Sequence, residues 1–169
     1  MILRKETRSR WIRGIFLILF LTIIDRLTKV WAAKTLTQGF DIAIIPGVLE
    51  LHYLENTGAA FSILTGKVLF LGIITVLMCV LIVFFMIKTP AERIYSPFWY
   101  CLVCLFAGAL GNFYDRIFYH YVVDFISFVL INFPIFNVAD IYVTVSMAVL
   151  VILILFVYDD DTLSRIIKK

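Results

Sequence analysis

Histidine, cysteine and charge are all scarce in this chain, and each scarcity excludes a class of function. The 169 residues include two histidines and three cysteines, too few for a multi-zinc scaffold or a disulfide framework. Cys101 and Cys104 lie one helical turn apart in an apolar run, so we interpret them as packing residues. Charged residues make up 16% of the chain with a net charge of +3, and no basic stripe alternates with aromatics. This composition argues against nucleic-acid binding.

Long uncharged runs take the place of charge and indicate a membrane protein. Hydrophobic residues make up 63% of the sequence and the mean hydropathy is +1.02. Residues 68–87, 94–114 and 141–158 carry no charge, and each run approaches the roughly 20 residues needed to cross about 30 Å of hydrocarbon. These runs predict three membrane-spanning helices.

The amino-terminal segment has two interpretations. Its uncharged part covers only residues 14–24, which resembles the apolar region of a signal peptide, with Trp31-Ala32-Ala33 as a loose cleavage site. We favour an uncleaved helix over about residues 11–33, because Asp25 and Lys29 are four residues apart and can pair on one helical face. The expected fold is a single all-α integral membrane domain, residues 1–169, with four transmembrane helices at about 11–33, 68–88, 94–115 and 140–158.

Basic residues predict the orientation of these helices. The amino-terminal arm, the connection between the second and third spans, and the carboxyl-terminal tail together hold ten of the 15 Lys and Arg residues. By the positive-inside rule this side faces the cytoplasm, and both termini are cytoplasmic. The loops at about residues 34–66 and 116–139 then face outward.

The first outer loop has the pattern of a small β-sheet. Residues 40–45 and 48–55 alternate in part between apolar and polar side chains, and Pro46-Gly47 between them is a turn signal. We expect an amphipathic extracytoplasmic sheet on the membrane surface, between the first and second helices.

Asp124 and Asp140 flank an uncharged stretch that is too short to cross the membrane and contains Pro134. Both carboxylates are therefore expected at one membrane face, the extracytoplasmic one. Ionisable groups near hydrocarbon are costly and indicate function. Two carboxylates that share one proton can activate a water and polarise a carbonyl, as in aspartic proteases, with no metal or cofactor.

Structural explanations remain for some of these polar residues. Asp140 is a candidate N-cap for the last span, with Asn137 able to cap in its place, and Asp115 and Arg116 are candidates for ending the third span. Taken together, however, the polar residues come from several segments and converge on one membrane level. They are Asp25, Arg26, Lys29, Asn56, Asn112, Asp115, Arg116, Asp124, Asn137 and Asp140.

Other chemistries have weaker support in the sequence. Metal ligation would draw on His52 with Glu55 or on His120 with Asp124, but no spacing completes a ligand set. A serine nucleophile activated by lysine would draw on Ser62 or Ser127 with Lys29, Lys34 or Lys67. Outside enzymes, the alternative is a small transporter or channel subunit with a polar relay at its outer face.

Five ordered motifs resemble the lipoprotein signal peptidase (signal peptidase II) family. They are residues 25–29 (DRLTK), 56–62 (NTGAAFS), 108–116 (GALGNFYDR), 122–125 (VVDF) and 136–140 (FNVAD). The resemblance implies an aspartyl endopeptidase of the bacterial cytoplasmic membrane that cuts prolipoproteins before the diacylglyceryl-modified cysteine. It also implies a small outer sheet that cradles the substrate.

The resemblance implies roles for individual residues and partners. Asp124 and Asp140 would be catalytic; Asn56, Gly58, Asn112, Arg116 and Asn137 would position the substrate or the pair; Asp25, Lys29 and Asp115 would form a structural polar cluster. Expected partners are lipidated prolipoproteins and membrane lipids, and we expect a monomer. The bulky run Ile141-Tyr142-Val143 departs from the small residues usual in the family, which puts the packing of the last span and the width of the pocket in question.

Overall fold

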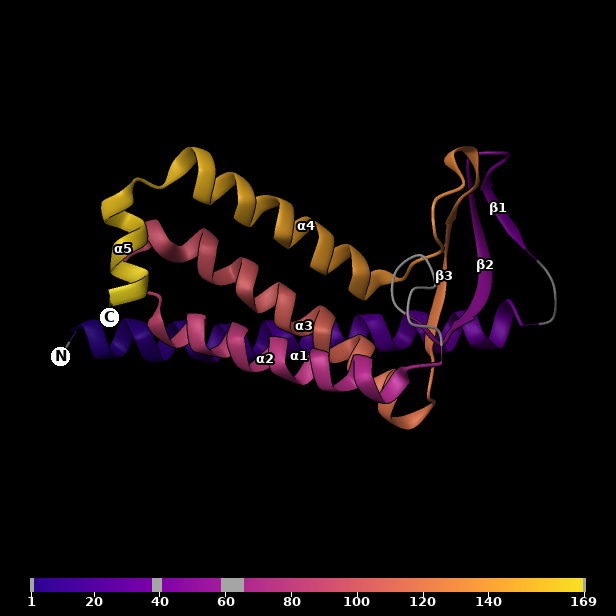
Figure 1. Ribbon diagram of the computed structural model, residues 1–169, viewed down its shortest axis with the longest axis horizontal. Coiled ribbons are helices and arrows are strands. Elements are labelled where there is room, and N and C mark those ends of the chain that lie inside the picture. Colours follow the sequence, from indigo (N-terminus) through magenta and orange to yellow (C-terminus); the bar gives the residue numbers. More distant parts are fainter. Residues whose placement is uncertain (1, 38–40, 59–65, 169) are drawn as a thin grey trace.

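Four long helices run side by side, with a β-sheet lying across one end of them (Figure 1). The structure is a computed structural model that describes residues 2–37, 41–58 and 66–168. The long helices are α1 (Ile2–Thr35), α2 (Val68–Lys88), α3 (Ser96–Phe118) and α4 (Val138–Ile152). Both termini lie at the end away from the sheet (Figure 1).

Three helical segments are long and apolar enough to cross a membrane: Val68–Lys88, Arg93–Phe118 and Val138–Val157. They coincide with the three spans predicted from uncharged runs. Helix α1 contains the predicted first span, residues 11–33, and its 34 residues are about 51 Å long at 1.5 Å per residue. The charges at both of its ends lower its hydropathy, so its role as a fourth span stays a prediction.

The sheet has three antiparallel strands in the order β1 (Ile42–Ile45), β2 (Leu49–Asn56) and β3 (Val122–Phe128). The strands β1 and β2 and the turn between them agree with the pattern in residues 41–55, whereas Phe40 lies outside the described residues. The expectation that the sheet comes from the first loop alone was wrong, because β3 comes from the segment between α3 and α4. Most of β3 is buried, partly against α1, so its sequence lacks the alternation of a one-sided strand.

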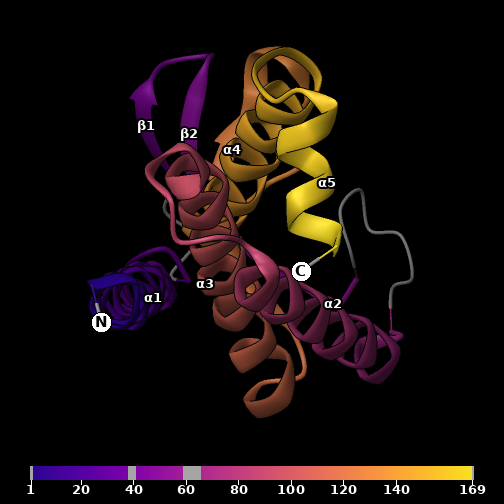
Figure 2. The ribbon, with the colours of Figure 1, turned by 90° about the vertical axis from the view of Figure 1, so that its left-hand side faces the viewer.

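Helix α3 lies at the centre of the bundle and contacts α1, α2 and α4 (Figure 2). Its glycines allow the close approach of these neighbours. A Cβ at Gly108 would lie 2.6 Å from the Ala139 carbonyl oxygen, and one at Gly111 would lie 2.5 Å from Asp25 Oδ2. The apolar core, centred on the fully buried Trp99, fills the half of the bundle away from the sheet.

The carboxyl-terminal tail forms an element that the sequence pattern did not predict. A π-helical turn, η4 (Leu153–Val157), ends the last membrane helix, and α5 (Asp160–Lys168) follows. Asp159 caps α5, because its Oδ1 accepts a hydrogen bond of 2.8 Å from Thr162 N. Ile166 is buried and Leu163 packs against the core, so α5 covers the end of the bundle that carries both termini.

Candidate active site

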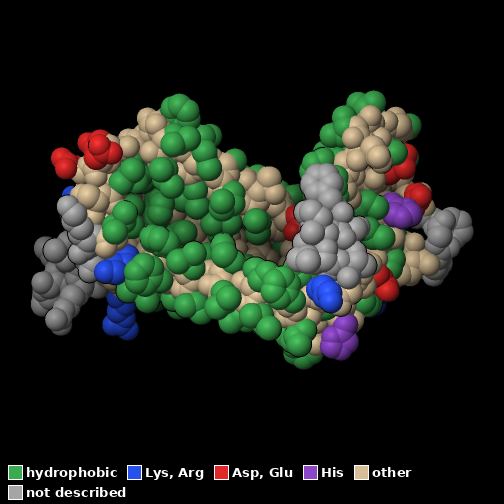
Figure 3. All heavy atoms as spheres, viewed as in Figure 1, with side chains coloured by type: hydrophobic (Ala, Val, Ile, Leu, Met, Phe, Trp, Pro, Cys, Tyr) green, Lys and Arg blue, Asp and Glu red, His purple; other side chains and the backbone are tan. Residues whose placement is uncertain are grey.

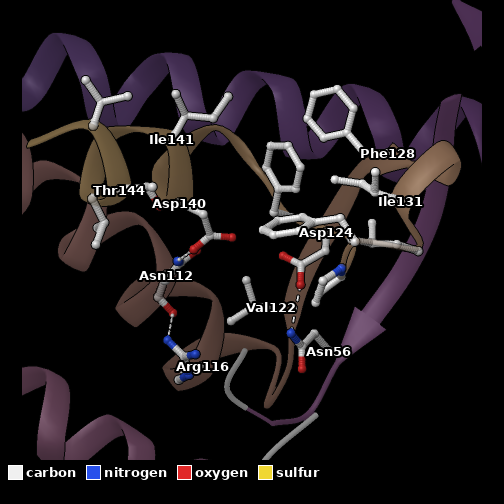
Figure 4. A pocket seen from close by; sticks show the side chains of 16 residues that line it. Asn56, Asn112, Arg116, Val122, Asp124, Phe128, Ile131, Asp140, Ile141 and Thr144 are labelled. Atoms are coloured by element: carbon white, nitrogen blue, oxygen red, sulfur yellow. Dashed lines mark hydrogen bonds between the residues drawn. The ribbon is translucent and has the colours of Figure 1, made fainter. Parts of the chain in front are cut away.

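Asp124 and Asp140 come from two different elements and face the same cavity (Figure 4). Asp124 lies in the middle of β3, opposite Leu54 of β2, and only 1% of its surface is exposed. Asp140 lies in the first turn of α4. The carboxylates point toward one another across the cavity, so the structure brings together the two acids that the sequence placed at one membrane face.

Asn137 connects the two carboxylates. Its Nδ2 donates to Asp124 Oδ1 at 2.6 Å, and its backbone N–H donates to Asp140 Oδ2 at 3.1 Å. In return, Asp140 N donates to Asn137 Oδ1 at 3.0 Å, which completes a capping box at the start of α4. The hypothesis that Asp140 is the N-cap was therefore wrong: Asn137 is the cap, because its extended backbone precedes the first helical turn. Asp140 is the third helical residue, where its side chain reaches back.

The side-chain amide of each asparagine in the site is oriented by a hydrogen bond that its Oδ1 atom accepts. The Oδ1 atom of Asn56 accepts from Gly58 N at 2.9 Å, so its Nδ2 points to Asp124 Oδ2 at 2.8 Å. The Oδ1 atom of Asn112 accepts from Asn137 Nδ2 at 3.1 Å, so its own Nδ2 points to Asp140 Oδ1 at 2.7 Å. An amide flip would set oxygen against oxygen, and the network therefore fixes all three amides as donors.

The pKa of Asp124 is raised to about 6 from an ordinary value of 3.8. Burial is the largest cause of the rise and the negative charge of Asp140 is the second, whereas the hydrogen bonds from Asn56 and Asn137 and the charge of Lys29 lower the pKa. Desolvation and a like charge both favour a carboxyl that keeps its proton. Asp124 can therefore change its protonation state near neutral pH, as acid/base catalysis requires.

Asp25, Lys29 and Asp115 form a separate buried ionic cluster beside this site. Lys29 Nζ lies 2.9 Å from Asp25 Oδ2, 3.1 Å from Asp115 Oδ2 and 2.8 Å from Asn112 Oδ1. Asp25 Oδ1 accepts from Ala139 N at 2.9 Å, so α1 is fastened to the first turn of α4. The cluster thus joins α1 to α3, which carries Asn112, and to α4, which carries Asp140.

The cavity that contains the two carboxylates has a volume of about 560 Å³ and a largely apolar lining. Polar side chains gather at one end of it, and apolar ones from α4 and from the segment after β3 form the rest. The lining residues are Asn56, Asn112, Arg116, Val122, Asp124, Phe128, Ile131, Phe133, Pro134, Ile135, Phe136, Asp140, Ile141, Val143, Thr144 and Val145. Such a cavity suits a ligand with an apolar body and one polar reacting group.

The other residues predicted for the site lie partly in the cavity wall and partly outside it. Arg116 lines the cavity, and its Nη1 donates to the Asn112 carbonyl at 3.4 Å. Gly58 acts through its backbone on Asn56, as described above. Ala59, Ala60, Phe61 and Ser62 of the second motif lie outside the described residues. Ile141 and Val143, from the unusual bulky run, are part of the cavity wall, whereas Tyr142 is not among the lining residues.

Comparison with known proteins decides the family. The family model of signal peptidase (SPase) II matches residues 17–156. A lipoprotein signal peptidase of Clostridium novyi is 43% identical over 145 residues, which are 83% of this chain and 96% of the relative. One from Enterococcus faecalis is 40% identical over 137 residues, 80% of each chain. The chain belongs to the signal peptidase II family. The alternative of a transporter or channel subunit is not favoured.

Solved structures agree with this membership. A bacterial membrane enzyme determined by the in meso method at 2.3 Å resolution is similar with a TM-score of 0.77 and 37% identity, over 85% of this chain and 87% of that one. A second such structure, at 1.9 Å resolution, gives a TM-score of 0.75 and 37% identity over 85% and 93% of the two chains. This signal peptidase II therefore shares its fold with solved membrane enzymes.

The other chemistries considered from the sequence find little support in the geometry of this signal peptidase II. Lys29 Nζ donates to Asp25, Asp115 and Asn112, so it has no free lone pair with which to activate a serine. His52 pairs with Asp41 at 2.7 Å, and Glu55 accepts a hydrogen bond from Tyr53, so His52 and Glu55 do not converge.

Arg26 contacts two tyrosines, Tyr114 and Tyr119, that were not predicted from the sequence. Its Nη1 donates to Asp115 Oδ1 at 2.9 Å, its Nη2 donates to Tyr119 Oη, and its guanidinium lies 5.0 Å from the Tyr114 ring centre. Tyr119 follows Asp115 by four residues and so lies on the same helical face. That spacing is the signal that would have identified Tyr119 as part of the cluster.

Proposed function

We propose that Asp124 and Asp140 are the catalytic pair of this signal peptidase II, an enzyme that removes signal peptides from prolipoproteins. We further propose that the cut falls before the diacylglyceryl-modified cysteine. The observation that carries the assignment is the position of Asn137, which donates to both carboxylates in one cavity. Two carboxylates that share a donor and, among the described residues, form no salt bridge are equipped for general acid/base catalysis.

The chemistry follows from one proton shared by the pair. The ionised aspartate accepts a proton from water as the water oxygen attacks the scissile carbonyl carbon. The protonated aspartate donates to the carbonyl oxygen, giving a neutral tetrahedral intermediate. The aspartate that took the proton from water then donates it to the amide nitrogen, while the other, now ionised, aspartate accepts a proton from a hydroxyl of the intermediate. The carbon–nitrogen bond breaks, giving a carboxylic acid and an amine, and the pair again holds one proton. No covalent enzyme intermediate forms.

The surrounding polar residues hold this pair in place. Asn56, Asn112 and Asn137 donate to carboxylate oxygens and fix the directions of the remaining lone pairs. Gly58 orients Asn56 through its backbone N–H. Arg116 lines the cavity and supplies positive charge beside it, where it can position the substrate backbone.

Asp25, Lys29 and Asp115 act as structural supports in this proposal. Their charges are paired with one another and with Arg26, so they contribute rigidity rather than proton transfer. Preorganised catalytic groups need such a second layer of contacts.

We propose that the enzyme is one domain with four spans, α1 being the fourth, in the bacterial cytoplasmic membrane. Both termini are cytoplasmic, because most basic residues lie toward that end, and the catalytic pair faces outward near the sheet. This position suits a lipidated substrate, since extracting an acyl chain into water costs about 0.8 kcal/mol per CH₂ group. Membrane lipids and prolipoproteins are its partners, and the enzyme acts as a monomer.

Cleavage of a purified precursor tests this function. We expect the enzyme in liposomes to cut a diacylglyceryl-modified precursor and to leave the unlipidated form intact. Asp124→Asn and Asp140→Asn each reduce the rate by at least about a thousandfold, because acid/base pairs contribute on the order of 10² to 10⁴ per group. Asp41→Asn is the matched control, since this exposed aspartate pairs with His52 and is not among the residues that line the cavity.

Full cleavage by either active-site variant would show that the pair is wrongly assigned. Equal cleavage of the unlipidated precursor would contradict the lipid requirement while leaving the pair intact.

A further inference from the structure

The free end of the sheet carries an exposed apolar surface that the catalytic chemistry does not use. We call it the apolar tip and define it as Ile44, Ile45, Val129, Leu130 and Ile131. Their exposed fractions are 53%, 51%, 44%, 69% and 67%. A cluster of large apolar side chains this exposed marks an interaction surface.

Two uncharged segments meet at the apolar tip. Residues 42–49 and 125–139 contain no Asp, Glu, Lys or Arg. The register pairs Leu49 with Phe128, and Val129 N donates to Val48 O at 3.0 Å, so the β1–β2 turn lies beside the short helix η3 (Val129–Ile131). The surface therefore offers hydrocarbon and no charge, which suits lipid chains rather than headgroups or a charged protein.

The direction of the sheet places this tip beside the membrane helices. The strands run across the helix direction, and their free end extends sideways from the bundle on the side of α4 (Figure 1). The surface is hollowed between α4 and the free end of the sheet, and acidic and histidine side chains gather on the opposite side of the sheet (Figure 3). The sheet is thus amphipathic in the sense expected at a bilayer surface.

The apolar tip is continuous with the surface of a membrane helix. Phe128 and Ile131 line the catalytic cavity from the tip, and Ile141 and Val145 line it from α4. Ile141 and Val145 are also exposed on α4, which is apolar and long enough to cross a membrane when η4 is included. The cavity therefore opens between two apolar surfaces, one of which is a candidate membrane span.

Backbone hydrogen bonding at the tip is compatible with a lipid environment. Val48 N donates to Ile45 O at 2.9 Å, Asn132 N to Val129 O at 3.1 Å and Phe133 N to Phe128 O at 3.1 Å. Asn132 has a positive φ of 49°, which turns the chain sharply and leaves Leu130 and Ile131 at the apex. Internal pairing of backbone donors lowers the cost of contact with hydrocarbon.

We propose that the apolar tip inserts into the hydrocarbon edge of the outer leaflet beside α4, so that the cavity opens into lipid and receives acyl chains sideways. The insertion itself rests on the exposed surface, and only the entry of acyl chains rests on the proposed function. The partner is the bilayer, and not a second copy of the chain or a soluble protein.

Tryptophan quenching in liposomes tests the insertion. Leu130→Trp and His52→Trp are compared in the full-length enzyme, and the signal of the unmodified chain, with its three native tryptophans, is subtracted. We expect tryptophan at position 130 to be quenched by lipids brominated in the upper acyl chain and protected from aqueous acrylamide. His52 is exposed on the same sheet, and tryptophan there should show the reverse.

Three quenching results would overturn the proposal. Quenching of the position-130 tryptophan by acrylamide, to the same degree as at position 52, would place the tip in water. Protection from both quenchers would mean that protein covers the tip. In the third result, the position-130 tryptophan is quenched by acrylamide in the free enzyme and by brominated lipid only after precursor is added. The tip would then be a substrate-binding surface that does not insert into the bilayer by itself.

Kinetics provide a second measurement. Leu130→Asp should raise KM for the lipidated precursor in liposomes by about tenfold with little change in kcat, because a charge at the tip opposes insertion and not chemistry. Leu130→Met conserves volume and hydrophobicity and should leave both constants unchanged. An unchanged KM in Leu130→Asp would contradict the proposal. Failure of the catalytic assignment would instead appear as residual cleavage by Asp124→Asn, with tryptophan quenching unaffected.

Discussion

Two groups of carboxylates lie on either side of Asn112, and they have different hydrogen-bonding and charged partners. Asp25 and Asp115 contact the ammonium of Lys29, and Asp115 also contacts the guanidinium of Arg26. In the part of the chain that the structure describes, Asp124 and Asp140 receive hydrogen bonds from amide and backbone N–H groups alone. The charges of the first group are balanced by two cations, whereas the second group is held by neutral hydrogen-bond donors.

Asn112 lies between the two groups and is hydrogen-bonded to both of them. Its Oδ1 accepts from Lys29 and its Nδ2 donates to Asp140, so it transmits orientation without placing a cation on the catalytic carboxylate. A lysine in direct contact with Asp140 would favour ionisation of both members of the pair and remove the acid that the mechanism needs. The difference suits the proposed roles: cations surround the carboxylates proposed as structural, and neutral donors surround the pair proposed as catalytic.

The largest expected effect comes from removing the shared cation. Lys29→Met leaves Asp25 buried without a cation, so we expect the free energy of unfolding to fall by about 3–5 kcal/mol. Asp124→Asn should lose activity but cost less stability than Lys29→Met, because it sets one amide NH2 against a donor without leaving a buried charge unpaired. Reversible unfolding in mixed micelles measures both variants. A stability loss of the same size in both would remove the distinction between the two groups.

A smaller effect is expected at the residue that joins the catalytic carboxylates. Asn137→Ala removes a donor to Asp124 and the cap of α4, so we expect kcat to fall by about a hundredfold and stability by about 1 kcal/mol. Asp159→Ala is the matched control, because it removes the cap of α5 far from the cavity. It should lose a similar amount of stability and no activity. If both variants kept full activity, Asn137 would be only a cap.

The pH dependence is a further way to separate the two groups. The pKa of Asp124 is about 6 when folded against an ordinary 3.8, so the folded enzyme binds this proton more tightly than the unfolded chain. The stability that this proton contributes is complete below about pH 4 and is lost as the pH rises through about 6. The temperature of half-unfolding should therefore decrease as the pH is raised from 5 to 7.5, and it should decrease less in Asp124→Asn. An equal pH response of stability in both proteins would remove Asp124 as its source.

The kcat/KM of the unmodified enzyme should decline above about pH 6, as the pair loses its shared proton.

The sequence predicted the helices better than the sheet because the two patterns differ in length. Uncharged runs near 20 residues identify membrane helices by themselves, and α2, α3 and α4 follow from them. The strand β3 is short, buried on both faces and paired with β2 across more than 60 residues of chain, so no local periodicity reveals it. Helix α5 is short and packs through Ile166, a tertiary contact that the sequence does not display.

The residues of the site could be predicted from the sequence, but the hydrogen bonds between them could not. Asp124 and Asp140 stood out because carboxylates beside apolar runs need an explanation. The capping box of Asn137, however, depends on backbone angles at the start of α4, and the orientation of Asn112 depends on Lys29, 83 residues away. Spacing identifies which residues gather at one level, but hydrogen-bond direction becomes visible only when the elements are packed.

The smallest expected effect lies at the exposed edge of the ionic cluster. Tyr119→Phe removes the hydroxyl that accepts from Arg26 and keeps the ring, whose centre lies 4.7 Å from the guanidinium. Arg26 retains its ion pair with Asp115, so we expect a stability loss of about 0.5–1 kcal/mol and unchanged kcat. Thermal unfolding and cleavage assays on the same sample measure both quantities. A fall in kcat without loss of stability would contradict a purely supporting role for this cluster, because its influence would then reach the chemistry at Asp140.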